Sequence, residues 1–282
     1  MTLVNSEYTK SNGHGGISLH YRELLDRLTR ERQAPFTPGE AATTLEMAPL
    51  RVRRLLTYWA SRGWLSRLRR GLYVTVPLGT KNPAQLSEDP WIVASHLFAP
   101  CYIGGWSACE HWGLTEQIFR GVVVFTTRKL HDQHPTIKET PYVLRTIPER
   151  KLFGTTAVWR GQTKVEVSSP ARTLVDLLND PTVGGGMRHI AEIIARFFTG
   201  EHRNDASLLE AIARLNNRTI YKRLGYLVET LKLDAPDVLA RCQERLSAGY
   251  SKLDPTVTAQ GPFLRRWRLR LNVAIRPEEL TP

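Results

Sequence analysis

The sequence predicts an α+β protein with three short helices and a β-hairpin first, a mixed α/β region next, and a run of helices last. Apolar residues recur at helical spacing three times between residues 19 and 62. The β-branched run Val122–Thr127 and the paired segments 156–159 and 164–167 predict strands. Helical periodicity returns beyond residue 187. With 282 residues, 41% of them hydrophobic and 23% charged, the chain has material for about two domains.

The first two helices follow from apolar spacing and capping residues. Leu24, Leu25 and Leu28 form an apolar stripe over residues 20–32. In the segment Thr37-Pro38-Gly39-Glu40, a threonine N-cap, a proline at the first helical position and a glutamate three residues after the cap make a capping box. This pattern predicts a short second helix over residues 38–45.

The third helix, residues 48–62, has two distinct faces and leads directly into a hairpin. Its apolar positions follow the spacing i, i+3, i+4 and i+7 and are expected to pack inward: Val52, Leu55, Leu56 and Trp59. Gly63 ends the helix. A strand–turn–strand follows over residues 64–76, and Gly71 at its tip supplies the positive φ that a tight hairpin needs.

The positive charge of the chain is concentrated on this helix and hairpin. Residues 45–76 contain seven arginines against the single Glu46, a net charge of +6 and thus half of the chain's +12 in about a ninth of its length. A helix followed by a basic hairpin is the order of a winged helix-turn-helix on duplex DNA. We therefore expect residues 18–80 to be a DNA-binding domain. Its candidate contacts are Arg51, Arg53, Arg54, Thr57, Tyr58, Arg67, Arg69 and Arg70. The alternative is a solvated basic face, but the charge continues from the helix into the hairpin tip, which favours DNA.

The rest of the chain divides into flanking segments and a second domain. Residues 1–17 are polar and lack an apolar stretch, so we expect a disordered lead-in and neither a signal peptide nor a membrane span. Residues 77–87 have the composition of a linker. Residues 86–282 are expected to form a mixed α/β domain with a helical subdomain at about 187–250. Its predicted helices are 91–98, 107–112, 169–178, 187–198, 205–217, 219–231 and 236–247, and a further strand is predicted at 142–147.

No motif predicts catalysis, a metal or a cofactor. The triplet Gly184-Gly185-Gly186 lacks the Lys-Ser/Thr of a P-loop and is interpreted as a turn. His131 and His134 lie in a polar loop with no second ligand pair nearby. Arg172 and Asp176, four residues apart, fit an ion pair on one helix face. We therefore expect a protein that is not an enzyme.

The cysteines indicate the compartment. Cys101, Cys109 and Cys242 are widely spaced and form no CxxC pair, which predicts buried, reduced thiols in a cytoplasmic protein. Cys109 and His111 are two residues apart on a predicted helix, so their side chains point apart and do not make a nucleophile–base pair.

A second basic segment lies near the C-terminal end. Arg265, Arg266, Arg268 and Arg270 surround Trp267, and the alternation with Leu269 and Leu271 predicts an edge strand. This segment is either a charged outer face or a surface for an acidic partner or RNA, since arginine beside an aromatic residue suits base stacking.

Four segments in order resemble the AbiEi family of abortive-infection antitoxins. They are residues 36–77, which include Gly63-Trp64-Leu65-Ser66-Arg67-Leu68-Arg69-Arg70-Gly71-Leu72-Tyr73; residues 102–115; Ser169-Pro170-Ala171-Arg172-Thr173-Leu174-Val175-Asp176; and Arg223-Leu224-Gly225-Tyr226. The resemblance covers about residues 20–275. One departure is Trp112, which separates His111 from Gly113 where the family pattern has histidine followed directly by glycine.

The resemblance implies a two-part antitoxin of a type IV toxin–antitoxin system. The N-terminal domain would bind inverted repeats in its own promoter and repress the operon. The C-terminal domain would counteract a nucleotidyltransferase-like toxin, without need of a stable complex between the two proteins. Two other readings stay open: a DNA-targeted nuclease or transferase, and a transcription factor whose C-terminal domain senses a ligand.

Overall fold

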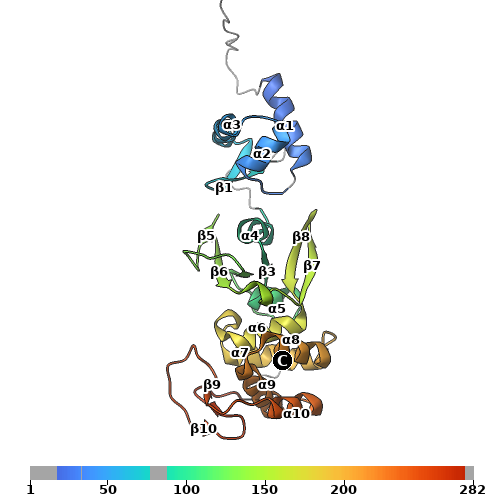
Figure 1. Ribbon diagram of the computed structural model, residues 1–282, viewed down its shortest axis with the longest axis vertical. Coiled ribbons are helices and arrows are strands. Elements are labelled where there is room, and N and C mark those ends of the chain that lie inside the picture. Colours follow the sequence, from blue (N-terminus) through green and yellow to red (C-terminus); the bar gives the residue numbers. More distant parts are fainter. Residues whose placement is uncertain (1–17, 33, 77–87, 277–282) are drawn as a thin grey trace, which may run out of the picture. The chain divides into compact units, whose positions relative to one another are not determined.

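The computed structural model describes residues 18–32, 34–76 and 88–276, which form two compact units within residues 1–84 and 85–282 (Figure 1). Helices come first and strands follow, so the α+β prediction is confirmed. The predicted lead-in at residues 1–17 and the predicted linker at 77–87 lie outside the described residues. No helix in the described part of the chain is both long enough and apolar enough to cross a membrane.

The N-terminal unit has the element order of a winged helix-turn-helix. Helices α1 (Leu19–Glu31), α2 (Pro38–Leu45) and α3 (Pro49–Ser61) precede the antiparallel pair β1 (Leu65–Arg69) and β2 (Leu72–Thr75). The predicted capping box is present, because the Glu40 amide donates to Thr37 Oγ1 (3.3 Å) and the Thr37 amide donates to Glu40 Oε2 (2.7 Å). One core joins all three helices to the hairpin through Leu28, Phe36, Leu45, Val52, Leu56, Trp59, Leu65 and Tyr73.

A six-stranded mixed sheet begins the C-terminal unit. Its strands lie in the order β5-β6-β4-β3-β8-β7, with parallel pairing of β6 to β4 and of β3 to β8 and antiparallel pairing elsewhere. The bounds are β3 (Cys101–Ile103), β4 (Val122–Thr126), β5 (Thr136–Ile137), β6 (Thr140–Thr146), β7 (Thr155–Arg160) and β8 (Thr163–Ser168). The predicted strands correspond to β4, β6, β7 and β8, whereas β3 and β5 were not predicted.

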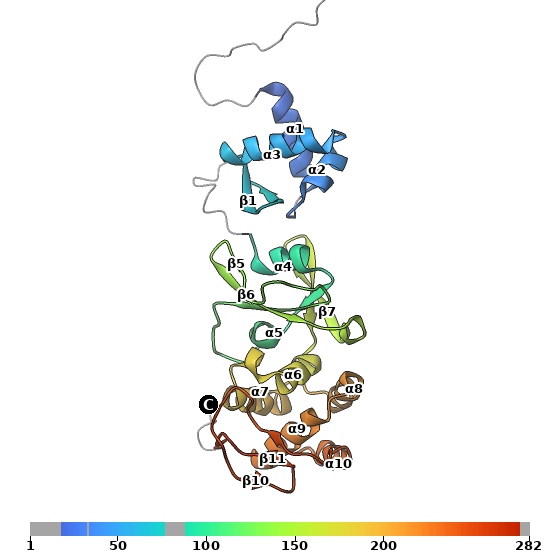
Figure 2. The same ribbon diagram turned by 60° about the vertical axis from the view of Figure 1, so that its left-hand side comes forward.

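Helices cover both faces of this sheet. Helix α4 (Pro90–Phe98) lies on one face, and α5 (Gly105–His111) and α6 (Pro170–Asn179) lie on the other (Figure 2). Beyond α6 follow α7 (Met187–Thr199), α8 (Asp205–Leu215), α9 (Arg218–Thr230) and α10 (Pro236–Glu244). The unit also contains two short 3₁₀ helices, Glu149–Lys151 and Pro181–Gly184, and the second includes the first glycine of the predicted Gly184–Gly186 turn. A continuous apolar core runs from the sheet to α10.

The segment 263–270 corrects the prediction of an edge strand. It forms two two-residue strands, β10 (Phe263–Leu264) and β11 (Leu269–Arg270), joined by a turn in which Arg268 has a φ of 51°. Strand β11 also pairs in parallel with β9 (Ser251–Lys252). The alternation of arginines and apolar residues is typical of a strand. Here, however, a turn directs Trp267 inward, and this side chain is completely buried.

The predicted ion pair of Arg172 and Asp176 is confirmed, and it is part of a buried cluster. The Arg172 guanidinium lies 3.0 Å from Asp176 Oδ1. The hydroxyl of Tyr102 on β3 donates to Asp176 Oδ2 (2.9 Å) and accepts from Arg172 (2.9 Å). All three side chains are buried, and burial raises the pKa of Tyr102, so the phenol stays protonated. The cluster therefore joins α6 to the sheet.

Candidate nucleic-acid interface

Helix α3 separates its apolar and cationic side chains as its sequence predicts. Val52, Leu56 and Trp59 are completely buried against α1 and α2. Arg51, Arg53, Arg54, Thr57 and Tyr58 are exposed. Pro49 occupies the first helical position, and Gly63, with a φ of 76°, follows the helix end. Burial of the apolar stripe thus fixes which side of α3 faces solvent.

None of the seven arginines of this region forms an ion pair with a carboxylate in the described residues. Glu46, the single acid of the segment, has its carboxylate 2.6 Å from the guanidinium of Arg27 on α1. Arg27 also lies 3.3 Å from Glu31. The positive charge of α3 and the hairpin is therefore not neutralised within the part of the unit that the structure describes, and it remains available to a polyanion.

Thr57 and Tyr58, the two uncharged candidate contacts on α3, differ in their hydrogen bonding and packing. The Thr57 hydroxyl donates to the Arg53 carbonyl (2.9 Å), so in this arrangement its oxygen is left to accept a hydrogen bond. Tyr58 packs edge-on against Trp64, with ring centroids 5.9 Å apart, and the guanidinium of Arg62 lies over its ring. Arg53, Arg54, Thr57, Tyr58 and Ser61 line a shallow groove on the outer side of the helix.

The hairpin presents the remaining arginines. Leu65, Ser66 and Leu68 of β1 are buried, whereas Arg67 and Arg69 are exposed. The register of β1 and β2 shifts between Arg67 and Arg69, which marks a β-bulge. Arg70 and Gly71 form the tip, and Gly71 has the predicted positive φ, 80°. The arginines of β1 therefore point away from the core, beside the arginine at the tip.

A backbone connection that the sequence did not predict holds the hairpin in place. The Phe36 amide donates to the Tyr73 carbonyl (2.8 Å), and the Tyr73 amide donates to the Phe36 carbonyl (3.0 Å). Both side chains are buried. The chain just before α2 thus acts as a one-residue third strand, which ties the hairpin to the start of the helix pair.

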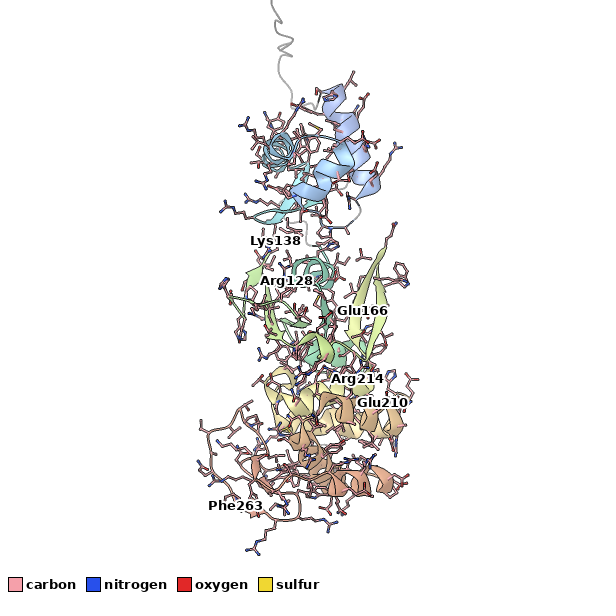
Figure 3. All side chains as sticks on the ribbon, viewed as in Figure 1. Arg128, Lys138, Glu166, Glu210, Arg214 and Phe263 are labelled. Atoms are coloured by element: carbon pink, nitrogen blue, oxygen red, sulfur yellow. The ribbon has the colours of Figure 1, made fainter. Side chains whose placement is uncertain are left out.

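The second basic segment has most of its arginines engaged within the unit. Arg266 lies 2.8 Å from Glu229, Arg268 donates to the Ala248 carbonyl (2.8 Å), and Arg270 donates to the Gly261 carbonyl (3.2 Å). The guanidinium of Arg270 also lies over the ring of Phe263, a side chain at the outer edge of the C-terminal unit (Figure 3). Arg265 is exposed and has no side-chain partner in the described residues.

The cysteine and histidine candidates do not come together. Cys109 and Cys242 are buried, and burial raises the pKa of Cys242 to about 12, so this thiol stays protonated. Cys101 is partly exposed, which differs from the prediction that all three are buried. His131 and His134 are exposed, and the described residues contain no group of three metal-ligating side chains.

The residues of α3 and the hairpin lie inside a recognised family region. Residues 23–76 match the family described as "Transcriptional regulator, AbiEi antitoxin". The resemblance to AbiEi is therefore confirmed for this part of the chain. The AbiEi match contains every candidate DNA contact from Arg51 to Arg70. Its description names a regulator and an antitoxin rather than an enzyme.

One solved structure is similar over nearly the whole length of both chains. It is the crystal structure of the RV2827C protein from Mycobacterium tuberculosis, with a TM-score of 0.63, 15% sequence identity, and coverage of 90% of this chain and 92% of that chain. At this identity the similarity shows a shared fold. No curated protein matches the sequence at a significant level.

Proposed function

We propose that the N-terminal unit binds duplex DNA at inverted repeats in the promoter of its own operon, with α3 as the recognition helix and the β1–β2 hairpin as the wing. Arg51 and Arg54 would contact base edges, and Arg67, Arg69 and Arg70 would contact phosphates. The protein would repress the operon as a transcriptional regulator of the AbiEi type.

The arrangement of charge carries this proposal. Seven exposed arginines on one helix and one hairpin have no carboxylate partner in the described residues, and the nearby Glu46 is engaged by Arg27. An ordinary solvated helix intersperses acids with bases and forms pairs at i, i+4. The AbiEi match over residues 23–76 supports the same interpretation.

The C-terminal unit, within residues 85–282, is proposed to counteract a nucleotidyltransferase-like toxin encoded in the same operon. Support comes from the antitoxin description of the matched family and from the unit's own continuous core. Because this core does not depend on the N-terminal unit's separate core, the two activities should be separable.

Co-expression with the toxin tests the proposal. The full chain with Arg51, Arg54, Arg69 and Arg70 all changed to alanine should lose promoter repression and still rescue growth. A matched control carries four alanines at arginines outside α3 and the hairpin: Arg22, Arg30, Arg150 and Arg188. This control has the same charge loss and should keep both activities.

Two outcomes would contradict the proposal in different ways. Repression that survives the four interface substitutions would exclude α3 and the wing as the DNA contacts. Rescue that disappears together with repression would show that the protein protects cells only by silencing the operon, and would exclude a separate antitoxin activity of the C-terminal unit.

A further inference from the structure

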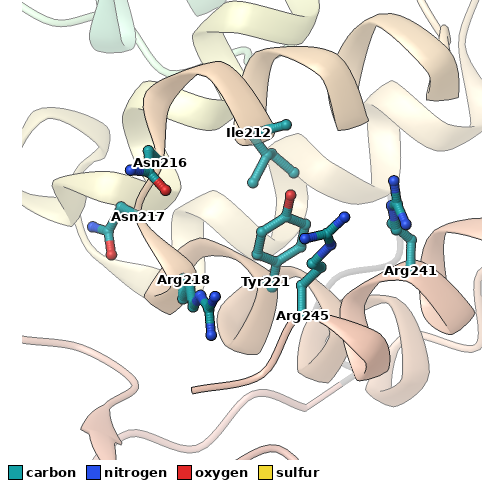
Figure 4. Close-up of a pocket in the computed structure, with 8 residues that line it drawn as sticks. Ile212, Asn216, Asn217, Arg218, Tyr221, Arg241 and Arg245 are labelled. Atoms are coloured by element: carbon teal, nitrogen blue, oxygen red, sulfur yellow. The ribbon is translucent and has the colours of Figure 1, made fainter.

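A small arginine-lined pocket lies in the helical part of the C-terminal unit. Its walls come from the end of α8, the start of α9, and α10 (Figure 4). Its volume is about 140 Å³. Pockets that enclose drug-sized ligands measure about 300–1,000 Å³. This pocket therefore fits one chemical group of a ligand rather than a whole ligand.

Three guanidinium groups line this pocket and no carboxylate does. Arg218 belongs to the first turn of α9, and Arg241 and Arg245 lie four residues apart on and just after α10. Arg241 is 3.0 Å from Glu244, a residue outside the pocket lining. Arg218 and Arg245 have no ion-pair partner among the residues that the structure describes. The pocket therefore carries an excess of about two positive charges.

Tyr221 lies between these cations. Its pKa is raised by burial, although Arg245, Arg241 and Arg218 each act to lower it, so the phenol stays protonated. All three arginines and Tyr221 line the same pocket. The Tyr221 hydroxyl has no hydrogen-bond partner in the described residues and can donate to a ligand.

The start of α9 adds a favourable field. Asn217 caps this 13-residue helix, and its side chain accepts from the Thr219 amide (3.1 Å). Asn216 and Asn217 both belong to the pocket lining. The positive end of this helix dipole thus lies at the same wall as Arg218 and favours a negatively charged group there, whereas α8 and α10 end at the other walls and oppose it, so the charge of the arginines carries the argument.

We propose that this pocket binds the phosphate group of a phosphate monoester, supplied either by a mononucleotide or by the phosphorylated 5′ end of an RNA. A monoester carries close to two negative charges and three free oxygens, which matches the excess charge and the several N–H donors of the three arginines. A carboxylate has one charge and two oxygens and would leave part of the cationic lining unpaired.

Calorimetric titration of the full chain tests the assignment, with inorganic phosphate, a nucleoside 5′-monophosphate, and short RNAs with 5′-phosphate or 5′-hydroxyl ends as probes. We expect saturable binding of the monophosphate with Kd below about 1 mM. Inorganic phosphate should compete. The 5′-phosphate RNA should bind more tightly than the 5′-hydroxyl RNA if RNA is the source, and the two should be equal if the source is a mononucleotide.

Substitutions locate the binding. Arg218→Ala and Arg245→Ala should each weaken monophosphate binding about tenfold or more, because each removes a charge-assisted hydrogen bond. Arg218→Lys and Arg245→Lys keep the positive charge but lose the paired N–H donors of the guanidinium group. Their affinities for the monophosphate should therefore lie between those of the unchanged protein and the alanine variants. Tyr221→Phe removes one hydroxyl donor. The matched control Arg150→Ala, an equal charge loss on an exposed arginine of the same unit, should bind as the unchanged protein does.

Three results would overturn the proposal. The first is absence of saturable monophosphate binding by the unchanged protein. The second is an equal loss in Arg150→Ala and in the pocket variants, which would indicate a diffuse charge effect. The third is loss of 5′-hydroxyl RNA binding in the pocket variants without any monophosphate binding, which would indicate a phosphodiester surface. Circular dichroism of each variant establishes that it is folded.

Discussion

The indole of Trp267 lies directly on Gly225 of α9. A Cβ placed on Gly225 would be 2.1 Å from Cζ3 of Trp267, far inside van der Waals contact. The indole Nε1 donates to Glu229 one turn further along α9 (2.6 Å). The tight turn that replaces the predicted edge strand thus places Trp267 on α9 at the glycine that leaves room for it.

A side chain at position 225 should therefore destabilise the C-terminal unit. Gly225→Ala is expected to lower its free energy of unfolding by about 1–3 kcal/mol through overpacking, despite the better helix propensity of alanine. Gly249→Ala is the control, since nothing lies within 4 Å of a Cβ there. Urea unfolding measures both. Equal stability of Gly225→Ala and the unchanged protein would mean that Trp267 does not pack on this helix.

The wing arginines should set the salt dependence of DNA binding. Each phosphate contact contributes about −0.9 to the log–log slope of affinity against salt concentration. Arg69→Ala with Arg70→Ala should therefore weaken binding to all duplexes and flatten the slope by about one to two units. Anisotropy titrations measure the slope. Arg22→Ala with Arg30→Ala removes the same charge from α1 and should leave it nearly unchanged, and a slope insensitive to the wing pair would exclude the wing.

The arginines at the start of α3 should carry sequence preference. A bidentate contact to a base is worth about 1–3 kcal/mol of discrimination. Arg51→Ala or Arg54→Ala should lower affinity for the operator more than affinity for random DNA, so the ratio of the two falls about 5- to 150-fold. Competition binding measures this ratio. A parallel fall of both affinities would assign these arginines to phosphates instead.

Removal of one partner from the buried cluster of Tyr102, Arg172 and Asp176 should lower the free energy of unfolding. Arg172→Leu leaves a carboxylate uncompensated and should cost about 3–5 kcal/mol of unfolding free energy, whereas Arg172→Leu with Asp176→Leu should recover most of it. Chemical unfolding of the two variants gives both values. A double variant no more stable than the single one would contradict this account.

The pH dependence of Arg172→Leu follows from the same burial. Burial raises the pKa of Asp176 and Arg172 acts to lower it, so removal of Arg172 should raise this pKa further. A carboxyl whose folded-state pKa is raised contributes full stability below its unfolded pKa of about 3.9 and loses it as pH rises. Arg172→Leu should therefore lose stability relative to the unchanged protein between about pH 4 and pH 7. A difference that stays constant over that range would show that Asp176 does not titrate on unfolding.

Local signals in the sequence predicted most of the helices. The bounds of α2 match the prediction because the capping residues Thr37 and Glu40 and the proline Pro38 determine its start within four residues. Arg51, Arg53 and Arg54 of α3 are exposed because the spacing of the apolar positions on this helix decides which face is buried.

Features that depend on distant residues were not predicted. Strands β3, β5, β9, β10 and β11 have only two or three residues each, and pairing partners elsewhere in the chain define them. Arg218 comes from a different helix than Arg241 and Arg245, so no single segment indicates the pocket. A partial signal exists, because Arg241 and Arg245 are spaced to share one side of a helix.

The two backbone hydrogen bonds between Phe36 and Tyr73 affect the entropy cost of the DNA contact that we propose for the hairpin. A two-stranded hairpin without further contacts would sample many orientations, and DNA binding would have to restrict them at a cost in entropy. The two hydrogen bonds to Phe36 restrict the hairpin during folding instead, at Tyr73, which lies two residues after Gly71 of the arginine tip. The hairpin is thus preorganised close to its tip, so the proposed contact of Arg69 and Arg70 with DNA would cost less entropy.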